Sequence, residues 1–262
     1  MGHQRLGTIP TTAQWNEIVA LLRATDEDTA ALSATLAAAT LDAAAPALRR
    51  AYADEGVRYT FFLLSQIVLA ARQNDWVLRL SRLGIQVDGA SSVFELTSQF
   101  AYAVDDHIEA AGFPSDVSEM AQRAACEALT TLANNQTGRL FDIGASDVKD
   151  ALRRMSTKSG FCALGQTFFG RFTARFLNFY LSRATATNLG TGAFSTVADV
   201  TAFNDSLRLH CEQSARIVRD FCGQWYSKTE YEQGIDEVNT SRFMAVAFQK
   251  LSKELGKQRE RL

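Results

Sequence analysis

Three acidic side chains close an otherwise apolar segment near the middle of the chain. Asp105 and Asp106 are adjacent, and Glu109 follows at the end of the segment 100–109. On a helix Asp105 and Glu109 lie four residues apart on the same face. Carboxylates this close repel each other and lose hydration, and a Mg²⁺ ion between them relieves both costs. The pattern predicts either a metal site or a solvated helix end whose acids pair with nearby basic groups.

A second polar pattern lies further along the chain, where Asn204, Arg208 and Glu212 are each four residues apart. With the acidic run, it resembles the two metal-binding motifs of class I terpene and prenyl-diphosphate synthases, which are all-helical. The resemblance implies Mg²⁺-assisted loss of diphosphate from an isoprenoid. Arg208 departs from the family pattern, which has a hydroxyl side chain at this position. The metal ligands implied are Asp105, Asp106, Glu109, Asn204 and Glu212.

A long segment of the chain combines basic and aromatic residues without any acid. No Asp or Glu occurs from residue 151 to residue 198. Arginines beside aromatic rings can bind a phosphodiester backbone while the rings stack on bases. The alternative is that the rings form core and the arginines pair with carboxylates inside the protein. The residues predicted to bind an anion or nucleic acid are Arg171, Arg175 and Arg183.

The elements that must position these groups are helices, because apolar residues recur at helical spacing along the chain. Ser92 followed by Glu95 predicts a capped helix start, and that helix should end at Gly112. We expect one long helix from about Val197 to Tyr226. We also expect a loop over 184–195 and a first turn or break at Pro46. No alternating pattern indicates a sheet, so the predicted fold is an all-α bundle of roughly nine to eleven helices.

The composition is that of a folded globular domain. The chain has 262 residues, of which 47% are hydrophobic and 21% charged. We expect a single helical domain over 1–262, with 1–135 and 146–262 as candidate lobes. Because 27 basic residues are balanced by 29 acidic ones, a basic field over the whole protein is excluded.

Cysteine, histidine and apolar patterns bear on the compartment. The four cysteines form no closely spaced pair, which favours reduced thiols over a disulfide framework. Three histidines without a cysteine cluster are too few for a recognisable structural zinc site. No apolar stretch is long enough for a signal peptide or a membrane span. We therefore predict a cytoplasmic protein without membrane association.

Two segments, Phe168–Leu177 and Trp225–Lys228, resemble uncharacterised all-helical accessory proteins of bacterial multigene loci, including antiviral-defence ones. The resemblance implies a protein–protein interaction or scaffold subunit of a larger bacterial assembly, with other subunits as partners. The resemblance carries over no functional residue, and we expect no cofactor, no catalytic residue and no small-molecule substrate. The alternatives are the Mg²⁺-dependent isoprenoid-synthase-like enzyme and the nucleic-acid-binding module. An interaction subunit requires a contiguous exposed apolar patch.

Overall fold

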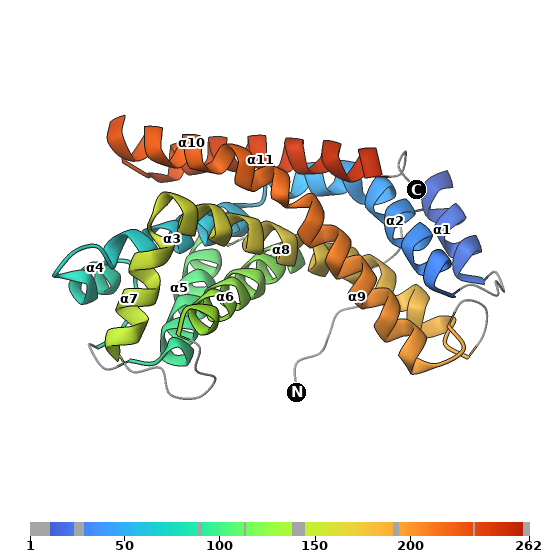
Figure 1. Cartoon of the computed structure of the whole chain (residues 1–262), viewed down its shortest axis with the longest axis horizontal. Coiled ribbons are helices and arrows are strands. Elements are labelled where there is room, and N and C mark those ends of the chain that lie inside the picture. Colours follow the sequence, from blue (N-terminus) through green and yellow to red (C-terminus); the bar gives the residue numbers. More distant parts are fainter. Residues whose placement is uncertain are drawn as a thin grey trace.

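The computed structural model describes residues 11–23, 29–88, 91–112, 114–137, 145–190, 194–232 and 234–258. These residues form eleven α-helices and no strand (Figure 1). Within the same residues, one isolated β-bridge pairs Leu189 with Phe194. The predicted all-α class and the predicted number of helices are therefore confirmed. None of the described helices is both long and apolar enough to cross a bilayer.

The helices of the two halves of the sequence pack on one another. The first half forms α1 (Ala13–Arg23), α2 (Thr29–Ala51), α3 (Glu55–Ala70), α4 (Trp76–Arg82), α5 (Val93–Ala111) and α6 (Asp116–Thr137). The second half forms α7 (Ala145–Met155), α8 (Lys158–Thr187), α9 (Val197–Ser214), α10 (Arg216–Glu232) and α11 (Glu237–Gln258). Helix α6 packs against α8, and α2 packs against α11 and α9 (Figure 1).

Local capping sets the ends of several helices. Helix α5 begins with the predicted capping box, in which the Glu95 amide donates to Ser92 Oγ at 3.2 Å. The Glu95 carboxylate in turn accepts from the Ser92 amide at 2.7 Å. The same helix ends at Gly112, whose φ of 75° is the left-handed conformation that glycine adopts without strain. Both predicted ends of this helix are confirmed.

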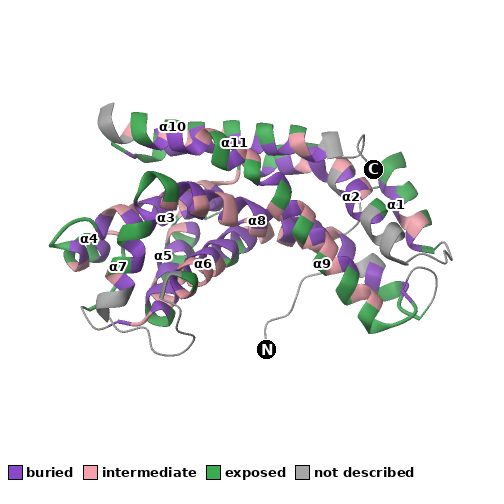
Figure 2. Ribbon diagram, in the orientation of Figure 1, coloured by how far each residue is buried: buried purple, intermediate pink, exposed green. Residues whose placement is uncertain are grey.

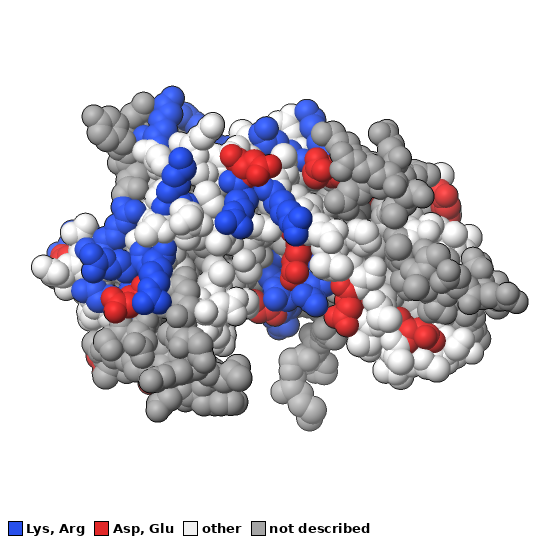
Figure 3. Space-filling model, viewed as in Figure 1, with Lys and Arg blue, Asp and Glu red and all other residues white. Residues whose placement is uncertain are grey.

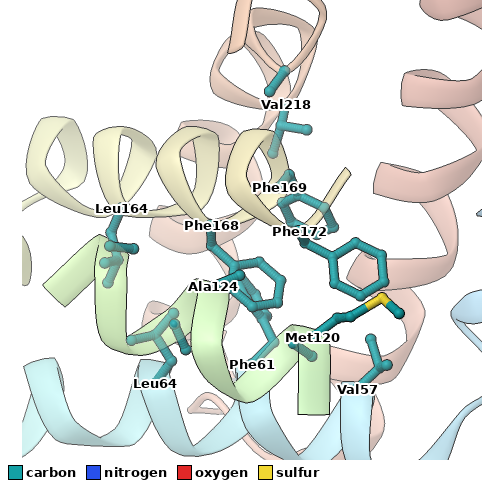
Figure 4. Packing of buried hydrophobic residues seen from close by; sticks show 14 of the residues in the cluster. Val57, Phe61, Leu64, Met120, Ala124, Leu164, Phe168, Phe169, Phe172 and Val218 are labelled. Carbon is teal, nitrogen blue, oxygen red and sulfur yellow. The ribbon is translucent and has the colours of Figure 1, made fainter. Parts of the chain in front are cut away.

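The aromatic residues of α8 form the centre of the core. Phe168, Phe169 and Phe172 are fully buried, and the inward faces of the surrounding helices are buried with them (Figure 2). The Phe61 ring of α3 lies 5.2 Å from that of Phe168, and the Phe248 ring of α11 lies 5.2 Å from that of Phe169. Side chains of α3 and α6 close around these rings (Figure 4). The aromatic stripe is therefore core, as one of the two interpretations of the segment predicts.

The aromatic pair Trp225 and Tyr226 attaches α10 to its neighbours. Tyr226 is buried, and its hydroxyl donates a hydrogen bond to the carbonyl of Ser156. The Trp225 ring stacks on Phe243 of α11, with ring centroids 4.2 Å apart and planes at 27°. These contacts hold the last two helices together on the bundle.

The predicted helix from Val197 to Tyr226 is wrong, because the chain bends at Ala215. Ala215 separates α9 from α10, and the Val218 amide donates to the Ala215 carbonyl at 3.0 Å. That bond spans three residues rather than four, which tightens the turn. A Cβ on Gly170 of α8 would lie 3.6 Å from Ala215 Cβ, so the bend packs directly on α8. The bend turns α10 so that it runs beside α11 (Figure 1).

Two further boundaries differ from the sequence prediction. Helix α2 continues through Pro46, where a first turn or break was expected, and ends at Ala51. Pro46 is exposed, so water can reach the backbone carbonyl that loses its helical donor at this proline. Helix α8 continues to Thr187, into the expected loop 184–195. Residues 138–144, which fall between the candidate lobes 1–135 and 146–262, lie outside the described residues.

Candidate functional site

The three acids of α5 form an exposed helix end. Asp105, Asp106 and Glu109 are all exposed. The Gln122 side chain of α6 donates hydrogen bonds to Asp105 Oδ1 at 2.6 Å and to the Ala101 carbonyl at 2.8 Å. Asp105 therefore has an uncharged donor from the neighbouring helix, which suits a solvated carboxylate.

The polar residues of α9 lie in a different part of the bundle. Helix α9 packs mainly on α8 and α2, whereas α5 packs on α6 and α3. Glu212 accepts a hydrogen bond from Arg208 at 3.0 Å, and Arg208 also lies 3.6 Å from Asp205. Arg208 thus neutralises acids on its own helix, while Asn204 is half-buried one turn before it. Within the described residues, no group of three or more His, Cys, Asp or Glu side chains could hold a metal ion.

The arginines of α8 face carboxylates of neighbouring helices. Arg171 lies 3.8 Å from Glu212 of α9, and Arg175 donates a hydrogen bond to Glu127 of α6. The Nε–H groups of both arginines are buried and donate no hydrogen bond within the described residues. Basic and acidic side chains accordingly alternate across the middle of the face in Figure 3. The side chain of Arg183 lies outside the described residues.

A groove between α2 and α11 was not predicted from the sequence. It encloses about 770 Å³. Its apolar surface includes Tyr52 and Val246, which are 40% and 42% exposed. The residues that line it are Pro46, Arg49, Arg50, Tyr52, Ala53, Ala245, Val246 and Gln249.

A second hollow of about 420 Å³ lies further along α11. It lies between α11 and the first turns of α3, and it contains Tyr59, Phe62 and the 60% exposed Val238. The α11 residues of the two hollows follow helical spacing on one face. Those residues are Val238, Ser241, Arg242, Ala245, Val246 and Gln249. We call the two hollows together the α11 groove.

The α11 groove is basic at its α2 end, whereas its α3 end carries Glu55 and Glu237 beside Arg58 and Arg242. Arg49, Arg50 and Arg242 make no ion pair within the described part of the chain. Arg58 pairs with Glu55 at the α3 end. The α2 end of the groove has two arginines and no acid among its lining residues. An apolar floor beside unpaired guanidinium groups can accept a surface that carries both aliphatic and carboxylate groups.

The sequence contained weak signals of this groove. Arg49 and Arg50 precede the aromatic Tyr52 directly, and Val238 and Val246 are apolar residues outside the inward face of the last helix. Each signal alone also fits an ordinary helix surface, where single exposed apolar residues are common. Only the packing of α2 and α3 beside α11 brings them together.

Comparison with known proteins adds no assignment to this geometry. The chain matches no protein-family model, no curated protein and no solved structure. The α11 groove, the ion-paired arginines and the two acidic segments are therefore interpreted from their own contacts.

Proposed function

We propose that the protein is a helical interaction subunit whose α11 groove binds an acidic amphipathic helix of a protein partner. The observation that carries this proposal is the groove itself, with Tyr52 and Val246 exposed beside the unpaired Arg49 and Arg50. The resemblance to accessory proteins of bacterial defence loci fits such a subunit. A bacterial cytoplasm is the setting we propose for it.

The dimensions of the groove suit a helix of about three turns. Val238 and Gln249 mark its ends on α11. At about 1.5 Å per residue, this face is roughly 16 Å long. A partner helix with apolar residues at spacings of three and four would place two or three anchors along it. Carboxylates on the flanks of that helix would meet the guanidinium groups of Arg49, Arg50 and Arg242.

The energetics favour a modest affinity. Tyr52, Val238 and Val246 are each between 40% and 60% exposed, so docking removes only part of their surface from water. Full burial of such a side chain is worth about 1.5–3 kcal/mol, so partial burial of three contributes a few kcal/mol. Charge pairs at the rim add specificity and association rate more than affinity. With a similar contribution from the anchors of the partner helix, we expect a dissociation constant on the order of tens to hundreds of micromolar.

A peptide selection tests the proposal. A phage-displayed library of helical peptides is selected on the folded protein, and binding of the enriched peptides is measured by fluorescence anisotropy. We expect enriched peptides with carboxylates and helically spaced aliphatic residues. Val246→Asp should weaken them about tenfold or more, because it places a carboxylate in the apolar floor. Arg50→Glu should weaken them through charge reversal.

The matched control is Val197→Asp, which changes a 68% exposed valine on α9, away from the groove. This variant should bind the peptides as the parent protein does. The proposal is wrong if enriched peptides are basic, or if they bind Val246→Asp and the parent protein equally well. Circular dichroism of each variant verifies that the helices are retained.

The alternatives have less support in the geometry. The nucleic-acid alternative depends on exposed arginines, and Arg171 and Arg175 instead face Glu212 and Glu127. The isoprenoid-synthase alternative requires acids of α5 and α9 around a shared ion, and these helices pack on different neighbours. We therefore propose neither in place of the interaction subunit.

A further inference from the structure

Two cysteines meet where α8 crosses α10. Cys162 of α8 and Cys222 of α10 both lie at this crossing. Each sulfur also lies over a glycine of the opposite helix. A Cβ on Gly165 would be 3.5 Å from Cys222 Sγ, and one on Gly223 would be 3.1 Å from Cys162 Sγ. Gly223 therefore allows the close helix approach at this crossing, whereas a Cβ on Gly165 would make an ordinary contact.

The surroundings make the two thiols chemically different. The neighbouring Cys222 thiol lowers the pKa of Cys162, and the nearby charges of Arg219 and Lys158 lower it further against the effect of burial. The neighbouring Cys162 thiol, together with burial, raises the pKa of Cys222. Cys162 is therefore the more readily ionised thiol of the pair.

The other two cysteines lack these features. Burial raises the pKa of Cys126 to about 11, and the nearby carboxylates of Glu127 and Asp105 add to this effect. Cys211 is completely buried, and burial raises its pKa strongly. Cys162 is 7% exposed whereas Cys222 has no exposed surface, so a small reagent reaches Cys162 first.

We propose that Cys162 is a peroxide-reactive thiol and that Cys222 converts its oxidised form into a disulfide between α8 and α10. The Cys162 thiolate attacks one oxygen of hydrogen peroxide, and the O–O bond breaks. The products are a sulfenic acid on Cys162 and hydroxide, which takes up a proton to become water. The Cys222 sulfur then attacks the sulfenic sulfur, and the S–O bond breaks. The oxygen leaves as water with the Cys222 proton, so two thiols are oxidised and one peroxide is reduced to two waters.

Peptide mapping after peroxide treatment tests this proposal directly. Trypsin places each cysteine in a separate peptide, namely 124–139, 159–171, 209–216 and 220–228. After brief treatment of the folded protein and alkylation of free thiols, we expect a disulfide between peptides 159–171 and 220–228. Cys126 and Cys211 should remain alkylated as free thiols. Intact mass should fall by two hydrogen atoms, and thiol reductant should reverse the change.

Single substitutions separate the two steps. In Cys222→Ser the sulfenic acid on Cys162 cannot be resolved, so dimedone should label peptide 159–171. Cys162→Ser should form neither a dimedone adduct nor the disulfide, and Cys126→Ser should react as the parent protein does. In the parent protein, Cys162 should be oxidised about tenfold faster than Cys126 or more, because a larger fraction of it is thiolate. The proposal is overturned if Cys162 stays reduced while Cys126 reacts, or if the disulfide joins any other pair.

Discussion

Arg171 and Arg175 differ from ordinary surface arginines because neighbouring helices supply their carboxylate partners. Their side chains are 25% and 32% exposed, and each reaches across a helix interface to a glutamate. Such half-exposed pairs contribute little to stability, since solvent screens the attraction. They fix instead which faces of α8, α9 and α6 meet. The acid-free segment of the sequence is thus balanced by acids from elsewhere in the chain.

A substitution at Arg175 separates this structural role from nucleic-acid binding. Arg175→Met retains the aliphatic stem and removes the charge opposite Glu127. We expect the free energy of unfolding in urea to change by less than about 1 kcal/mol, because the pair is partly exposed. We also expect no change in oligonucleotide retention at low salt. A marked loss of retention, with stability unchanged, would restore the nucleic-acid alternative.

Gly56 of α3 marks a close crossing between this helix and its neighbours α5 and α6. A Cβ on Gly56 would lie 2.3 Å from Ser118 Cβ of α6 and 2.8 Å from Ile108 Cδ1 of α5. No rotamer change moves the Cβ of Ser118, so α3 and α6 must separate to admit an alanine. The same crossing positions the start of α3, which lines one end of the α11 groove.

Gly56→Ala should therefore destabilise the protein by about 1–3 kcal/mol, as overpacking of a core does. The measurement is urea denaturation followed by circular dichroism. Gly165→Ala is the matched control, since its Cβ would make ordinary contacts at 3.5 Å and 3.8 Å. At Gly165 the higher helix propensity of alanine should leave stability unchanged or raise it by up to about 1 kcal/mol. Equal destabilisation by both substitutions would contradict this account of the crossing.

Local signals in the sequence predicted helix ends well and helix bends poorly. Ser92 and Gly112 carry the side chain and the backbone freedom that a helix start and end require, so both ends could be predicted. Ala215 carries no such mark, because the bend there depends on packing against Gly170 of α8. At Pro46 the error is the opposite one, because the sequence predicted a break that the structure does not have. Helix α2 continues through this proline, which lies on an exposed side of the helix.

At the scale of the whole molecule, sequence patterns identified the core but could not identify the surface. The phenylalanines of α8 are buried because a stripe of rings has no favourable alternative to the interior. The α11 groove combines residues from α2, α3 and α11, which no local pattern relates. The spacing of acids on α5 and α9 suggested a shared site, but spacing along a helix does not determine which helices become neighbours.

The packing between halves predicts a single cooperative unfolding transition. Helix α6 packs on α8 and α2 packs on α11, so we expect neither candidate lobe, 1–135 or 146–262, to retain its core alone. Thermal unfolding followed by circular dichroism and by tryptophan fluorescence should give coincident curves. A fragment of residues 1–137 should lose most of its helical signal. Two separated transitions, or a stably helical fragment, would instead establish independent lobes.

The bend at Ala215 makes this protein sensitive to chain length as well as to residue size, because Ala215 is completely buried against α8. One inserted residue would rotate α10 by about 100° about its axis and advance it by about 1.5 Å. Trp225 would then leave the Phe243 ring on which it stacks, and α11 would lose the neighbour that braces it. Deletions and insertions near Ala215 should therefore be far more damaging than substitutions of its exposed neighbours Gln213 and Arg216.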